Sequence, residues 1–258
     1  MHPIIFQSNI FSIHSLWVFV AIALVVATYA FIKIGLSNGL KLQFLSENAF
    51  KIIVVAMIGA RLVAILVNWT TFFYEYSLDT FLQIFKLWDK GLSLWGAVIF
   101  GVGMLYYLCK KNEQDFWKWM DSLVPAFFIG VAISAIGMFM DGSNYGNETS
   151  LPWGVNFESP AIKFTVPIHP TQIYMLLYTT SISTALLHLK KLKFFEPNGR
   201  IALTGIAAFS LIHFLQEFVR GDDVLKVMGI RFPMIVAAIV FISTLIFYFY
   251  KYNKTKSN

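Results

Sequence analysis

The chain has 258 residues, of which 57% are hydrophobic and 13% are charged, and its mean hydropathy is +0.66. Soluble domains contain roughly 45–50% apolar residues, so this composition excludes an ordinary soluble protein and indicates an integral membrane protein. The net charge of +6 would suit nucleic acid, but the basic residues lie at the edges of apolar runs, so we expect no nucleic-acid partner. The single cysteine, Cys109, excludes an intrachain disulfide and a cysteine-based metal site.

Seven stretches are long and apolar enough to be membrane-spanning helices, each of which needs about 20 residues. The third and sixth are the weakest candidates, because small or polar groups interrupt them. We therefore predict an all-α, polytopic membrane protein that forms a single domain over residues 1–258. In chain order the predicted spans are about 11–34, 49–70, 91–109, 117–140, 170–189, 200–218 and 230–250.

The distribution of basic residues predicts the orientation, since cytoplasmic loops are enriched in Lys and Arg. Thirteen of them fall on one side of the seven spans and six on the other, while Arg61 lies inside a span. We therefore expect the N-terminus outside and the C-terminus in the cytoplasm. The longest connection, residues 141–168 between helices four and five, becomes an external loop, and loops of this length are more often functional than plain connectors. Its polar and aromatic residues include Asp141, Asn144, Asn147, Glu148, Trp153 and Glu158.

Two groups of charged residues lie inside predicted spans, where a central charge costs at least about 2.5–3.5 kcal/mol. Arg61 follows Gly59 and Ala60, and it either bonds to backbone carbonyls in helix packing or contacts an anionic lipid headgroup. His213, Glu217 and Arg220 are spaced to share one helical face. That face suits either a structural ion-pair ladder or a site that holds a phosphate or acts as a base.

Two further polar segments lie at the ends of predicted spans. The sequence HPTQIY at 169–174 begins the fifth span, where Pro170 suits the first turn of a helix and where a helix N-terminus beside His169 could receive an anion. The sequence DGSN at 141–144 ends the fourth span. Together these residues indicate polar groups gathered towards the outer leaflet, for which a phospholipid headgroup is the natural ligand.

At these residues the chain resembles the bacterial prolipoprotein diacylglyceryl transferases, a family of seven-span enzymes of the cytoplasmic (inner) membrane. The resemblance implies transfer of a diacylglyceryl group from phosphatidylglycerol to the lipobox cysteine thiol of a secreted lipoprotein precursor, with glycerol phosphate as leaving group. These two substrates are the expected partners, and we expect neither a cofactor nor a metal ion. The similar segments are HPIIF near the start, GARL at 59–62, LSLWGA at 92–97, DSLVPAFFIGVAISAIGMFMDGSNYG at 121–146, HPTQIY at 169–174 and EFVRGDD at 217–223.

Four positions depart from the family's pattern. Trp95 stands where the family has a His, Ala135 and Met138 stand where it has an Arg and an Asn, and His213 stands where it has an Arg. An altered or inactive member, which binds phospholipid or modifies another acceptor, is therefore the alternative hypothesis.

The reaction needs a base that makes thiolate and cations that hold the phosphate. For the chemical step we predict His213, Glu217 and His169 as catalytic residues. The residues predicted to bind the phospholipid are Arg61, Arg220, Asp141, Gly142, Ser143, Asn144, Gln172 and Tyr174.

Overall fold

The computed structural model describes residues 3–8, 12–73, 77, 82, 84, 91–157, 162–196 and 198–253. The predicted loop residue Glu158 and four of the basic residues used for the orientation (Lys86, Lys90, Lys254 and Lys256) lie outside the described residues. The chain divides into two compact units, Met1–Asn38 with Trp117–Asn258 and Gly39–Phe116, and each is described by itself.

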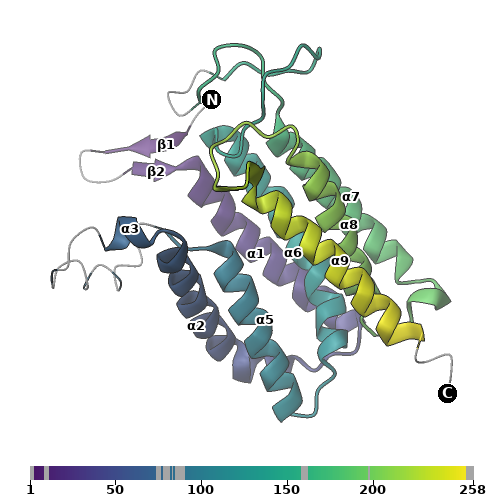
Figure 1. Cartoon of the computed structure of the whole chain (residues 1–258). Helices are drawn as coiled ribbons and strands as arrows, with labels where there is room; N and C mark the ends of the chain where they lie inside the picture. Colours follow the sequence, from purple (N-terminus) through teal and green to yellow (C-terminus); the bar gives the residue numbers. More distant parts are fainter. Residues whose placement is uncertain are drawn as a thin grey trace. The chain divides into compact units, whose positions relative to one another are not determined.

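The first unit is built mainly from five helices. They are α1 (Ser15–Ser37), α6 (Phe116–Asp141), α7 (Thr171–Leu189), α8 (Arg200–Gln216) and α9 (Phe232–Asn253). Figure 1 shows α8 between α7 and α9, with which it packs. Gly205 lets α8 approach α7 closely, because a Cβ there would lie 2.6 Å from Leu186 Cδ1.

Three short elements complete the first unit. Strands β1 (Ile4–Gln7) and β2 (Ser12–His14) form an antiparallel hairpin before α1. Strands β3 (Lys226–Val227) and β4 (Ile230–Arg231) form a second antiparallel hairpin between α8 and α9. A single 3-10 turn, η2 (Lys193–Phe195), lies between α7 and α8.

The second unit contains α2 (Leu42–Val67), α3 (Trp69–Phe72) and α5 (Leu94–Lys111). Glycines bring α2 and α5 into backbone contact, since a Cβ on Gly96 would lie 2.2 Å from the Gly59 carbonyl oxygen. Ser93 adds to this contact, because its amide donates to the Ala60 carbonyl at 3.0 Å. The close helix approach expected beside Arg61 is therefore present within this unit.

The all-α prediction is confirmed, and a long helix lies at each of the seven predicted spans. Some boundaries differ. The predicted start near residue 11 is wrong, because Ser12–His14 pair with Ile4–Gln7 as strands. The second helix begins at Leu42 rather than near 49, because its first two turns mix buried Phe44 with polar residues, of which Gln43 donates to Glu47 at 2.8 Å.

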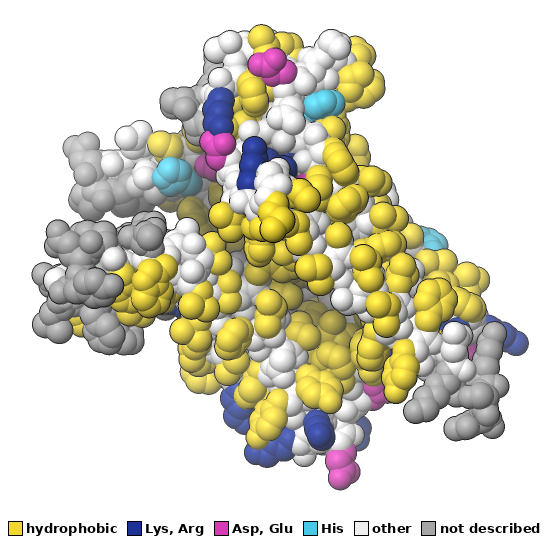
Figure 2. All heavy atoms as spheres, viewed as in Figure 1, with side chains coloured by type: hydrophobic (Ala, Val, Ile, Leu, Met, Phe, Trp, Pro, Cys, Tyr) yellow, Lys and Arg dark blue, Asp and Glu magenta, His cyan; other side chains and the backbone are white. Residues whose placement is uncertain are grey.

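Within the described part of the chain, four helices are long and apolar enough to cross a membrane: α1, α2, α6 and α9. Helix α8 is apolar but shorter. Figure 2 shows hydrophobic side chains over the visible face of α9. Three residues of this helix, Ile239, Ile246 and Phe249, are more than half exposed. Exposed apolar surface of this extent suits contact with lipid rather than water.

Helix α8 begins at a cap that another helix supplies. Its N-cap residue is Gly199, with φ +95°, which has no side chain to accept hydrogen bonds. The Asp121 carboxylate on α6 instead accepts from the Gly199 and Ala202 amides, at 2.6 and 2.8 Å. A carboxylate is favoured at a helix N-terminus, so Asp121 fixes where α8 starts against α6.

Replacing Asp121→Ala removes both acceptors and leaves two helix amides unpaired. We expect a loss of about 1–2 kcal/mol of stability, measured as a lower midpoint of thermal unfolding in detergent. Glu47→Ala is the matched control, because Glu47 is an exposed acid that accepts a hydrogen bond from Gln43 and caps no helix. Equal midpoints for the two variants would contradict the capping role.

Gly146 lies where three backbone segments meet. A Cβ there would be 2.4 Å from the His169 carbonyl oxygen and 3.0 Å from that of Val219. The Gly146 amide donates to the same His169 carbonyl at 3.1 Å, and Gly146 also pairs with Arg220 as an isolated β-bridge. The connection after α6 therefore packs on the segments before α7 and after α8 without room for a side chain.

We expect Gly146→Ala to push these segments apart, and so to lower the thermal midpoint and any transfer activity together. Gly103→Ala on α5 is the control, because a Cβ there has open space and Ala favours a helix by about 0.5–1 kcal/mol. The idea fails if Gly146→Ala is as stable and active as Gly103→Ala, with thermal midpoint and turnover measured on the same preparations.

Candidate functional site

The turn after α6 is tied to the start of α7. Gly142 and Asn144 adopt left-handed conformations, with φ of +83° and +58°, which turn the chain sharply. Gln172 donates from Nε2 to the Ser143 carbonyl at 2.6 Å, and the Thr171 hydroxyl donates to the Asn144 carbonyl. The structure therefore brings the predicted site residues at 141–144 and at Gln172 together.

The described part of the α6–α7 connection has a small core of its own. Tyr145, Phe157, Ile162 and Ile168 are buried against one another, and Phe139 from the end of α6 packs on them. The Ile168 backbone pairs with Val155 in both directions, at 3.0 and 3.1 Å. This folded connection is where the sequence predicts a functional loop.

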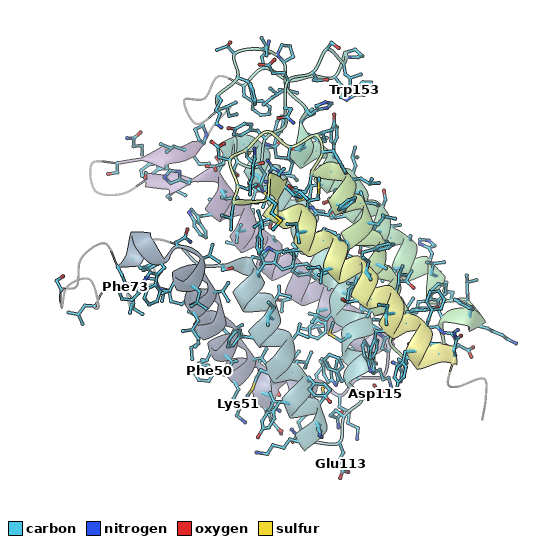
Figure 3. All side chains as sticks on the ribbon, in the orientation of Figure 1. Phe50, Lys51, Phe73, Glu113, Asp115 and Trp153 are labelled. Carbon is cyan, nitrogen blue, oxygen red and sulfur yellow. The ribbon has the colours of Figure 1, made fainter. Side chains whose placement is uncertain are left out.

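A chain of hydrogen bonds joins this connection to α7. Trp153, labelled in Figure 3, donates from Nε1 to the Tyr174 hydroxyl at 2.8 Å. The same hydroxyl lies 3.1 Å from His169 Nδ1. The Tyr174 hydroxyl therefore links Trp153 on the connection to His169, just before α7.

The three residues predicted on one helical face do form a charge cluster, but the predicted face is wrong in its extent, because α8 ends at Gln216, and Glu217 and Arg220 lie in the segment just after it. The Glu217 side chain is fully buried. Its Oε1 accepts from Arg220 NH1 at 3.2 Å and lies 3.7 Å from His213 Nε2. The Arg220–Glu217 ion pair of the predicted ladder is therefore present, with His213 beside it, and burial makes this setting electrostatically strong.

Arg220 links this cluster to the turn after α6. Its NH2 donates to Asn144 Oδ1 at 2.7 Å, while its Nε and NH2 donate to the two Asp222 carboxylate oxygens at 2.9 and 2.5 Å. Two of the predicted phospholipid-binding residues, Arg220 and Asn144, are thus in direct contact.

Two members of the cluster were missed in the sequence, Arg231 and Asp222. Arg231 donates from Nε to Glu217 Oε2 at 2.7 Å and from NH2 to Asp222 Oδ1 at 2.8 Å. Arg231 lies 14 residues after Glu217 in the sequence, so helical spacing does not predict their contact. The only local signal is an Arg placed just before an apolar span, after the turn at Met228 and Gly229.

Burial alone would raise the pKa of the Asp222 carboxyl. The hydrogen bonds and positive charges of Arg220 and Arg231 outweigh that effect, so the pKa of Asp222 lies below its ordinary value. Asp222 is therefore ionised at neutral pH, and the cluster holds two guanidinium groups against two carboxylates.

The ring of His213 is oriented by its neighbours. The Tyr178 hydroxyl donates to Gln216 Oε1 at 3.0 Å and lies 3.3 Å from His213 Nδ1. With its proton on Gln216, the Tyr178 oxygen accepts from His213 Nδ1–H, which leaves Nε2 as the basic nitrogen facing Glu217. The Phe209 ring stacks on the imidazole, with 5.4 Å between centroids and 8° between planes.

A hollow of about 390 Å³ opens beside the cluster. Near it, Lys163 pairs with Asp223 on the surface. Ser143 Oγ and Gln172 Oε1 are buried and have no hydrogen-bond partner within the described residues, and Ser143 lines the hollow. The hollow is lined by Asp141, Gly142, Ser143, Asn144, Tyr145, Asp222 and Asp223.

Arg61 belongs to the second unit, where it is 5% exposed. It donates from Nε to the Ile84 carbonyl at 2.8 Å and from NH1 to the Gly91 carbonyl at 2.9 Å, and its guanidinium lies 4.6 Å from the centre of the Phe72 ring. The packing interpretation of Arg61 is therefore confirmed, while its contact with a lipid headgroup stays a prediction.

Comparison with known proteins agrees with the resemblance read from the sequence. A family model described as prolipoprotein diacylglyceryl transferase matches residues 3–250. The curated relatives include proteins named phosphatidylglycerol–prolipoprotein diacylglyceryl transferase. That of Finegoldia magna is 29% identical over 252 residues, which cover 95% of this chain and 94% of the relative. That of Clostridioides difficile is 28% identical over 252 residues (97% and 96%), and that of Corynebacterium diphtheriae is 26% identical over 238 residues (85% and 83%). Because the match spans nearly the whole chain, this protein belongs to the prolipoprotein diacylglyceryl transferase family and is a transferase.

Proposed function

We propose that the protein moves the diacylglyceryl group of a phosphatidylglycerol-like phospholipid to a cysteine thiol of a secreted lipoprotein precursor. The family match over residues 3–250 carries this proposal. In the reaction a carbon–sulfur bond forms, the bond between the same glycerol carbon and a phosphate oxygen breaks, and glycerol phosphate leaves. The thiol proton passes to a base. The names of the curated relatives favour this reaction over an inactive phospholipid-binding member.

The proposed setting is the bacterial cytoplasmic membrane, with one transmembrane domain over residues 1–258. All seven long helices would span it, with the N-terminus outside and the C-terminus in the cytoplasm. The apolar character of α1, α2, α6 and α9 supports this arrangement. The α6–α7 connection and the Glu217 cluster would then lie together near the outer leaflet, since Arg220 contacts Asn144.

His213 is the preferred base. Its Nε2 faces Glu217 at 3.7 Å, and the carboxylate would stabilise the imidazolium that forms on taking the thiol proton. His169 is the second candidate, and its Nδ1 lies 3.1 Å from the Tyr174 hydroxyl. The carboxylate beside His213 is the feature that supports His213 as the base.

The phospholipid headgroup would occupy the hollow beside the cluster. Arg220 contacts two residues of its lining, Asn144 and Asp222, and a guanidinium suits a departing phosphate, whereas the lining carboxylates of Asp141, Asp222 and Asp223 would repel one. Ser143, which lines the hollow, has a buried hydroxyl without a partner among the described residues, and Gln172 is a predicted contact beside it. The other predicted contacts in this unit, Asp141, Gly142 and Tyr174, remain part of this proposal, and Arg61 remains a predicted lipid contact of the second unit.

Expression of the chain in bacterial cells depleted of their own transferase tests the function. We expect lipid-modified precursor to reappear, detected by the mass of its modified N-terminal peptide. Glu217→Gln is the matched negative control, because it removes the charge that both guanidiniums hold. No modification by the unaltered chain, with the protein detected in the membrane, would refute the proposal.

Replacing His213→Gln should lower the turnover number by about 10²-fold or more, because general-base catalysis contributes that much. The KM for phospholipid should change little, and the rise of rate with pH that reports the base should disappear. His188→Gln is the control, since His188 is exposed near the other end of α7. A loss confined to His169→Gln would instead assign the base to His169.

A further inference from the structure

Glu217 and three neighbouring charged side chains form a closed ring of ion pairs. Glu217 and Asp222 each accept from both Arg220 and Arg231. The side chains of Glu217, Arg220, Arg231 and Asp222 are 0%, 7%, 13% and 15% exposed. Water therefore screens these pairs little, and removing one member leaves the others buried with unbalanced charge.

Arg231 differs from the other three members in where it comes from. Glu217, Arg220 and Asp222 lie close together in the segment just after α8, whereas Arg231 belongs to β4, the second strand of the short β3–β4 hairpin. The tip of this hairpin is fully open to its surroundings, with Met228 98% exposed. Arg231 also donates from NH1 to the Asp222 carbonyl at 2.8 Å, so its contacts anchor the hairpin to the site.

The two oxygens of Glu217 have separate tasks. Arg231 takes Oε2 at 2.7 Å, which leaves Oε1 to face Arg220 at 3.2 Å and His213 at 3.7 Å. Without Arg231, Oε2 would be a buried acceptor with no partner, at a cost of about 1–3 kcal/mol or more for a charged group. Glu217 would then rotate towards Arg220 and away from His213.

The same argument applies to Arg220. Its guanidinium is divided among Glu217, Asp222 and Asn144. Arg231 holds Asp222 by a side-chain and a backbone oxygen, and so fixes the carboxylate that in turn fixes Arg220. Glu217 and Arg220, to which the proposed function gives roles in the reaction, thus both depend on Arg231, which has no such role.

We propose that Arg231 is a positioning residue for the transfer reaction, which holds Glu217 towards His213 and Arg220 towards the hollow. The inference rests on the proposed function. It assigns the β3–β4 hairpin a part in the site, although the hairpin supplies no group that touches the reacting atoms.

The test uses the full chain in lipid nanodiscs with phosphatidylglycerol and a peptide that carries a lipobox cysteine. We expect Arg231→Met to lower the turnover number by about 10²-fold, as a misplaced catalytic group does, with a change of less than about threefold in the KM for peptide. Arg231→Lys should recover part of the loss, because one ammonium can hold Glu217 but cannot reproduce the fork. Lys226→Met is the matched control, since Lys226 is exposed and is the backbone partner of Arg231 in the hairpin.

A double variant separates positioning from a merely structural role. If Arg231 acts through Glu217, adding Arg231→Met to Glu217→Gln should reduce the remaining activity by less than about threefold. A full further 10²-fold loss in that background overturns the inference, and so does an unaltered turnover number in Arg231→Met. Should Arg231→Met fail to accumulate, Arg231→Lys and Arg231→Gln carry the same comparison.

The outcomes also distinguish this inference from the function beneath it. An unaltered chain that transfers nothing in this assay overturns the proposed function, and the inference with it. An active chain whose Arg231 variants match Lys226→Met overturns the inference alone.

Discussion

A buried carboxylate at the end of α8 sets the conditions for the site. The Glu217 side chain has no exposed surface, so its charge persists only with strong partners, and the chain provides Arg220 from the same segment and Arg231 from the next hairpin. These ion pairs constrain where α8 ends, where β4 lies and how the segment between them runs. The geometry of the site therefore follows mainly from the need to pair this buried charge, and apolar packing is secondary.

The second constraint is the turn after α6, which would be costly without outside support. Asn144 holds a left-handed conformation, and it is fastened on three sides: its carbonyl accepts from Thr171, its Oδ1 accepts from Arg220, and its Nδ2 donates to Met138 Sδ at 3.0 Å. Each fastening comes from a different part of the first unit. Asn144 therefore connects the charge cluster to the hollow and to the start of α7.

The structure shows the surroundings of three residues that depart from the family's pattern. Met138, where the family has an Asn, still accepts a hydrogen bond from Asn144. His213, where the family has an Arg, faces the carboxylate that Arg220 and Arg231 already share. Ala135 is completely buried in α6 and carries no charge to the site. A transferase with these replacements would rely more heavily on Arg220 and on an imidazole base.

Local sequence by itself determined the helices and the contacts within one turn or two of them. Apolar runs located the seven long helices, and Pro170 marked the start of α7. The spacing of His213, Glu217 and Arg220 predicted that they meet, although α8 ends at Gln216 and the last two lie in the segment just after it. Whether all seven helices cross a membrane stays a prediction.

Tertiary structure decided the rest. The β1–β2 hairpin replaced the expected start of the first span, Arg231 and Asp222 joined the site, and Asp121 capped a helix that begins 79 residues after it. These contacts join residues that lie far apart in the chain, or residues whose spacing in the sequence does not predict a contact. They form only when packed helices bring the groups together in a buried setting, where an unpaired charge or amide is too costly to leave.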